Sequence, residues 1–143
     1  MVSYHWTQQA PFQWTRVDML LALLEETIRV LETLQQAIER EKDGAREEAQ
    51  TEALWQRGRL LVAALLSGVY PESGEPGWLC WRLYEFVLHV VEQRQVDSLA
   101  GALQVLRTLF EAFQTIRPEA VSLERAGAIP GLDSVGIGLG KMA

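Results

Sequence analysis

The stretch VDMLLALLEETIRVLETLQQAI, residues 17–38, places large apolar side chains three and four positions apart. Because an α-helix has about 3.6 residues per turn, this spacing aligns them along one side of a helix. Polar and charged residues fill most of the other positions, so the opposite side suits water. The apolar stripe consists of Val17, Leu20, Leu21, Leu24, Ile28, Leu31, Leu34 and Ile38. The sequence therefore predicts a long amphipathic helix that packs against other apolar surfaces.

This first helix has a start signal, and an aromatic segment precedes it. Thr15 is a residue type that caps helix N-termini, and Asp18 follows three positions later, where Glu or Gln would complete a capping box. We expect the helix to run from there to about Lys42. Residues 1–15 form an N-terminal arm with one proline, Pro11, and four aromatic residues, namely Tyr4, Trp6, Phe12 and Trp14.

Two more helices follow the first. Gly44 breaks the apolar stripe, and the same periodicity predicts a second helix over about 45–67. The stretch GVYPESGEPG, residues 68–77, holds three Gly and two Pro, a density typical of a surface loop between helices. A third helix is then predicted over about 77–95.

A fourth helix and a tail complete the chain. Asp97 or Ser98 can cap a helix that continues to about Arg117, where the proline at 118 is expected to end it. The rest, residues 118–143, is rich in Gly and has no helical period, so we interpret it as a flexible tail. The alternative is a segment that docks on an apolar surface, because it retains several Ile, Leu and Val side chains.

The predicted fold class is all-α, and no strand pattern interrupts the helices. A chain of 143 residues suits one domain with its own core. Helices joined by short connections lie antiparallel to their neighbours, because short loops leave no room for another arrangement. The sequence therefore predicts an antiparallel up-and-down four-helix bundle over residues 16–117.

Composition narrows the functional classes. Thirteen basic and nineteen acidic residues give a net charge of −6, which argues against nucleic acid and favours an apolar or mildly basic partner. The single cysteine, Cys80, forms no internal disulfide, and neither a signal peptide nor a membrane-spanning stretch is recognised, so a soluble cytoplasmic protein is expected. No metal site or cofactor is predicted, because neither clustered ligands nor a phosphate-binding loop is present.

Residues 80–93, CWRLYEFVLHVVEQ, hold the side chains that invite a catalytic interpretation. At about 100° per residue, the polar ones share one face of the third helix. These are Arg82, Glu85, His89, Glu92 and Gln93. We interpret this face as the solvated side of the helix. The alternative is a HEPN-type ribonuclease, since Arg82 and His89 resemble its loose Arg-x4-6-His motif, with Arg steadying phosphate and His serving in acid–base cleavage.

The apolar side of the same helix covers about 220°, roughly twice what packing against a core requires. We expect the surplus edge, formed by Trp81, Tyr84 and Leu88, to lie under the arm or tail or to form a surface for a partner. The two interpretations are compatible if the cover is displaced when the partner binds.

Several segments in order resemble the flagellin export chaperone family. Residues 15–19 (TRVDM) and 23–25 (LLE) are similar to that family's Thr-Pro-Glu-Glu-Leu opening and Leu-Tyr-Asp core. Residues 83–87 (LYEFV) resemble its Leu-Tyr-Asp-Tyr-Met stretch, and residues 112–113 (AF) its final Ala-Trp. The resemblance spans residues 4–117.

This resemblance implies a cytoplasmic four-helix bundle that holds the disordered, apolar C-terminal segment of flagellin and prevents its premature polymerisation, without catalysis. It also implies that Tyr4 or Trp6 matches an N-terminal Tyr that can lie on the bundle when no client is bound. We therefore expect a monomer or weak homodimer with partner-binding residues Tyr4, Trp6, Trp81, Tyr84 and Leu88. A generic helical adaptor with another protein partner is the alternative within the same class.

Overall fold

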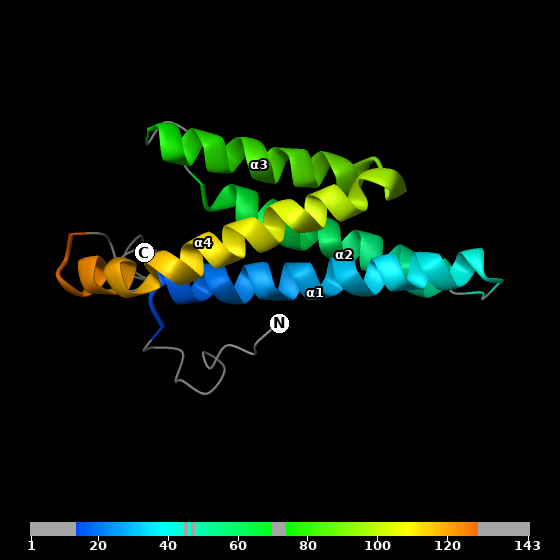
Figure 1. Ribbon diagram of the computed structural model, residues 1–143, viewed down its shortest axis with the longest axis horizontal. Coiled ribbons are helices and arrows are strands. Elements are labelled where there is room, and N and C mark those ends of the chain that lie inside the picture. The colour runs from blue at the N-terminus through cyan, green and yellow to red at the C-terminus, as the bar shows by residue number, and fades with distance from the viewer. Residues whose placement is uncertain (1–13, 45, 47, 70–73, 129–143) are drawn as a thin grey trace, which may run out of the picture. The chain divides into compact units, whose positions relative to one another are not determined.

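The computed structural model describes residues 14–44, 46, 48–69 and 74–128, and every regular element in these ranges is helical (Figure 1). The elements are α1 (Arg16–Lys42), α2 (Glu48–Ser67), α3 (Glu75–Glu92), the short 3-10 helix η4 (Val96–Ser98) and α4 (Leu99–Arg125). The all-α fold class is confirmed for the described part of the chain. The predicted arm up to residue 13 and the tail from residue 129 lie outside it.

The helices divide between two compact units. One contains the described residues within Met1–Ala22 and Phe110–Ala143, and the other contains those within Leu23–Leu109. Helices α2 and α3 belong wholly to the second unit, whereas α1 and α4 contribute residues to both. The N-terminal turns of α1 and the C-terminal half of α4 therefore share the first unit.

The apolar stripe of α1 is buried, as its spacing predicts. Leu21, Leu24, Leu31 and Leu34 are fully buried, and Leu20 alone among the stripe residues is half-buried. Burial of each such side chain contributes about 1.5–3 kcal/mol relative to exposure. The period of the sequence thus determined which face of α1 meets the core.

In the second unit, α2 packs against α3, and Figure 1 shows α2 running alongside α3. Gly58 of α2 lies close to side chains of both α1 and α3. A Cβ atom at this position would lie 2.9 Å from Leu31 Cδ2 on α1 and 3.8 Å from Val91 Cγ1 on α3. Carbon atoms pack best at about 3.5–4.0 Å, so a larger residue at this position would force the buried Leu31 side chain to shift.

In the first unit, α1 begins with a reciprocal cap. The Asp18 carboxylate accepts hydrogen bonds from the Thr15 backbone N–H at 3.1 Å and from the Thr15 hydroxyl at 2.8 Å. A capping box satisfies backbone donors that the first helical turn leaves without partners. The start predicted at Thr15 is confirmed, with Asp in place of the usual Glu.

The prediction that Pro118 ends the fourth helix is wrong, because α4 continues to Arg125. A proline inside a helix removes one backbone donor and costs about 3 kcal/mol. Contacts beyond Pro118 offset this cost. Val121 is buried, and Glu124 accepts a hydrogen bond from the Arg16 N–H at 2.8 Å. Residues 118–125 are therefore helical and do not belong to a flexible tail.

The helix ends seven residues after the proline, in a glycine turn. Gly127 has a φ of +80°, and the Ala128 N–H donates to the Leu123 carbonyl at 2.9 Å. Glycine favours this left-handed conformation because it has no Cβ atom. The stop signal of α4 is thus Gly127, which lies in the segment expected to be the tail.

Candidate partner-binding surface

Helix α3 starts at Glu75, two residues earlier than predicted. Pro76 lies in the first turn, where its missing N–H leaves no hydrogen bond unmade. The Trp78 N–H donates to the Gly74 carbonyl at 3.0 Å, which closes the first turn. The loop signal in the sequence thus includes residues that begin the helix.

The buried side of α3 is formed by Tyr84, Val87, Val90 and Val91. Tyr84 has no exposed surface, so of the two interpretations of the surplus edge it fits a covered residue and not an exposed partner surface. Tyr84 lies two turns before Val91, which is close to Gly58 of α2. A helical wheel cannot show where a neighbouring helix lies. Trp81 and Leu88 are half-buried, while Tyr4 and Trp6 lie outside the described residues.

Exposed apolar side chains of α3 lie elsewhere, on Trp78, Leu79 and Phe86. Their exposed fractions are 49%, 53% and 43%. Leu79 and Phe86 are two turns apart on one side of the helix, and Trp78 adjoins Leu79. The surplus edge expected from the sequence, Trp81, Tyr84 and Leu88, contains none of these three residues. Their distance on the wheel from the Val-rich centre of the helix is the signal that could have found them.

The polar face of α3 is exposed, as predicted, and adjoins these apolar groups. The Arg82 guanidinium lies 5.2 Å from the centre of the Trp78 ring, and its Nε is 3.9 Å from Glu85 Oε1. A cation over an aromatic face at this distance is attracted by the ring's electron density. We use the name α3 surface for Trp78, Leu79, Arg82, Glu85 and Phe86.

Arg82 and His89, the two residues of the ribonuclease hypothesis, are both exposed on this side of α3. Arg82 is directed toward Trp78 and Glu85. His89 Nε2 lies 3.5 Å from the Gln95 side-chain nitrogen. A carboxylate beside Arg82 would oppose a phosphate there, because like charges repel. The geometry therefore lends the catalytic hypothesis no further support.

Cys80 and Tyr84 lie one helical turn apart on α3. Burial raises the pKa of the Cys80 thiol, and this effect exceeds the opposite influence of the Tyr84 hydroxyl. Burial also raises the pKa of Tyr84, and the nearby Cys80 raises it further. Although the two groups influence one another, their geometry falls short of a hydrogen bond, so the buried Tyr84 hydroxyl has no partner among the described residues. A protonated, half-buried thiol is a poor nucleophile, which agrees with a packing role for Cys80.

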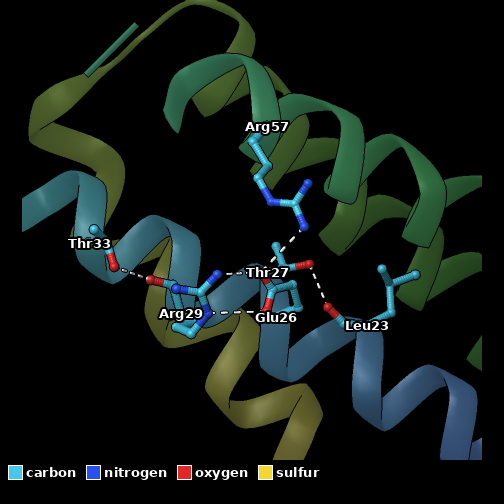
Figure 2. A network of polar contacts seen from close by, with 6 residues as sticks. All are labelled: Leu23, Glu26, Thr27, Arg29, Thr33 and Arg57. Carbon is cyan, nitrogen blue, oxygen red and sulfur yellow. Dashed lines mark hydrogen bonds and ion pairs between the residues drawn. The ribbon is translucent and has the colours of Figure 1, made fainter. Parts of the chain in front are cut away.

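A second polar cluster joins α1 to α2, and Figure 2 shows Arg57 of α2 reaching toward Glu26 of α1 beside Arg29. Arg29 donates to both Glu26 carboxylate oxygens, at 3.1 and 2.5 Å, and Arg57 Nη2 is 3.5 Å from one of them. Hydrogen bonds from Arg29 lower the pKa of Glu26, against the opposing effect of partial burial. Both arginines are thus engaged with a carboxylate, and the cluster links two helices.

None of the described helices combines the length and hydrophobicity needed to cross a membrane. No group of three His, Cys, Asp or Glu side chains in the described ranges is arranged to hold a metal ion. Comparison with protein-family models, curated proteins and solved structures gives no match. The α3 surface is the candidate site with the clearest physical basis.

Proposed function

We propose that the protein binds an apolar, helix-forming segment of another protein on its α3 surface. The observation that carries this proposal is the exposure of Trp78, Leu79 and Phe86 on one helix. Covering apolar area gains about 25 cal/mol per Å², so a partner that buries these side chains is stabilised on them. Exposed apolar groups gathered on one surface are typical of interaction sites.

The resemblance to flagellin export chaperones suggests the client. We propose a cytoplasmic chaperone that holds the C-terminal segment of flagellin and prevents its premature polymerisation. The four described helices suit the antiparallel up-and-down bundle of that family, since α3 and α4 are joined by a short connection. Residues 83–87, which resemble a family segment, lie on the same helix as the α3 surface.

A peptide-binding experiment tests this proposal. The probe is a synthetic peptide covering a flagellin C-terminal segment, titrated into the full chain by calorimetry. We expect the double variant Leu79→Asp with Phe86→Asp to bind at least about tenfold more weakly, because two carboxylates would be buried against apolar groups. The control is Val96→Asp, which places one such carboxylate on an exposed apolar residue of η4.

The titrations test both the binding surface on the protein and the identity of the client. Unchanged binding by the double variant, with a native helical spectrum, would show that the α3 surface is not the site. Failure of the natural chain to bind the flagellin peptide, together with binding of an unrelated amphipathic helix, would favour the generic adaptor. A further variant lacks residues 1–14 of the N-terminal arm. If the arm competes with the client, this deletion is expected to tighten binding of the peptide or leave it unchanged.

A further inference from the structure

The exposed side of α3 has a spacing that suits pairing with another helix. Positions 75, 78, 82, 85, 89 and 92 alternate between steps of three and four, so their side chains form one row along a side of the helix. The six residues are Glu75, Trp78, Arg82, Glu85, His89 and Glu92, and all six are exposed. Apolar Leu79 and Phe86 flank this row on one side.

The two central positions of the row, Arg82 and Glu85, carry opposite charges and are complementary when the row is reversed. The midpoint of the row lies between residues 83 and 84. In an antiparallel pair whose midpoints coincide, Arg82 of one copy faces Glu85 of the other. By the same symmetry, Trp78 faces His89. In a two-fold interface every contact occurs twice, so two opposite-charge pairs would form at the centre. We propose that two copies of this chain associate through antiparallel α3 helices, with Arg82 of each copy opposite Glu85 of the other.

Arg82 and Glu85 are only loosely paired within one copy, so each can also pair with the other copy. Arg82 Nε and Glu85 Oε1 in one copy are 3.9 Å apart, which is longer than the roughly 2.7–2.9 Å of a charge-assisted hydrogen bond. Both side chains are about half exposed, at 57% and 50%. Each can therefore bind a second partner of opposite charge. Leu79 and Phe86, at 53% and 43% exposed, supply apolar area beside the pair.

The same geometry limits the strength of the dimer. A helix of 18 residues is about 27 Å long, so one such helix from each copy buries less than the roughly 800 Å² per partner of a standard interface. Glu75 would also face Glu92 of the other copy, and these carboxylates repel. The expected dimer is weak and reversible. This inference goes beyond the proposed function and does not depend on it, although both use one surface.

Sedimentation analysis of the full chain over a range of concentrations tests the pairing. We expect the natural chain to dimerise as its concentration rises, and Arg82→Glu or Glu85→Arg alone to weaken association about tenfold or more. An equimolar mixture of the two variants should regain the association. In the mixed pair the introduced glutamate of one copy would face the introduced arginine of the other, and the remaining Glu85 would face the remaining Arg82. Each single variant carries two like charges at these positions, so rescue cannot arise from contacts within one helix.

Two further variants sharpen the result. Glu92→Lys would replace the repulsion with attraction to Glu75 and should strengthen the dimer several-fold. Arg59→Glu makes the same charge change as Arg82→Glu on an exposed residue of α2 and should leave association unchanged. A natural chain that stays monomeric at several hundred micromolar overturns the inference, as does a mixture no more associated than its components. Neither result bears on binding of the flagellin peptide, which the calorimetric experiment decides.

Discussion

Arg117 Nε lies 2.7 Å from Asp18 Oδ1, which joins two residues that are 99 positions apart in the chain. Asp18 is 1% exposed, and its other carboxylate oxygen accepts the hydrogen bonds from Thr15. One side chain therefore caps the start of α1 and binds α4 within the first unit. Burial of a carboxylate is costly unless such partners surround it.

Replacing this carboxylate should lower stability in a manner that depends on pH. Burial alone would raise the pKa of Asp18, but hydrogen bonds from Arg117 and Thr15 outweigh it and lower the pKa. The folded pKa is thus below the unfolded pKa, so this contribution is present above about pH 4 and disappears as pH falls through the folded value. We expect Asp18→Asn to reduce the free energy of unfolding by about 2–4 kcal/mol at pH 7.

Urea unfolding between pH 7 and pH 3 measures this effect. The difference in the free energy of unfolding between the natural chain and the Asp18→Asn variant should shrink as the pH falls below about 4. Glu39→Gln is the matched control, because the Glu39 side chain is 65% exposed and pairs with Lys42 one turn along the same helix. A difference that stays constant with pH would mean that the charge of Asp18 does not contribute.

Arg94 should behave differently when replaced by Gly and by Ala. Its φ of 52° is left-handed, a conformation that disfavours side chains, and it follows the C-terminus of α3. Its guanidinium binds both carboxylate oxygens of Glu52 and lies 6.0 Å from the centre of the Trp55 ring. Both variants lose these contacts, but Gly removes the backbone strain. The melting temperature should be highest for the natural chain, lower for Arg94→Gly and lowest for Arg94→Ala. A higher melting temperature for Arg94→Ala than for Arg94→Gly would show that the backbone at position 94 is not strained.

Replacement by alanine should lower the stability of the protein at Gly58 and raise it at Gly101. At Gly58 the new methyl group would lie 2.9 Å from Leu31 Cδ2, whereas at Gly101 nothing lies within 4 Å. Overpacking costs about 1–3 kcal/mol, while alanine in an open helical position gains about 0.5–1 kcal/mol over glycine. Chemical denaturation should show Gly58→Ala destabilised and Gly101→Ala stabilised. Equal effects at both positions would mean that α1 and α2 do not approach closely at Gly58.

Tyr84→Phe should be neutral or stabilising. The ring is fully buried, and its hydroxyl has no hydrogen-bond partner among the described residues. Removing an unsatisfied buried hydroxyl recovers its desolvation cost, about 1 kcal/mol, while the packing of the ring is kept. Tyr84→Ala, which also removes the ring, should cost about 3–5 kcal/mol. A loss of stability in the Phe variant would reveal a partner for the hydroxyl.

The sequence by itself determined the helices and the buried stripe of α1. Apolar side chains at steps of three and four have one way to leave water together, namely along one side of a helix. The capping residue Thr15 and the solvated side of α3 followed from the same local rules. These features depend on residues close in sequence, so no knowledge of distant neighbours was needed.

Only the tertiary structure decided the end of α4 and the position of the candidate site. Pro118 is a local stop signal, but beyond it Val121 is buried and Glu124 accepts a hydrogen bond from Arg16 in the first unit, and both stabilise the continued helix. Likewise, the wheel of α3 gave an apolar arc without saying which part a neighbouring helix covers. Tyr84 is buried and Phe86 is exposed because burial depends on where other helices lie, and one helix's own sequence does not contain that information.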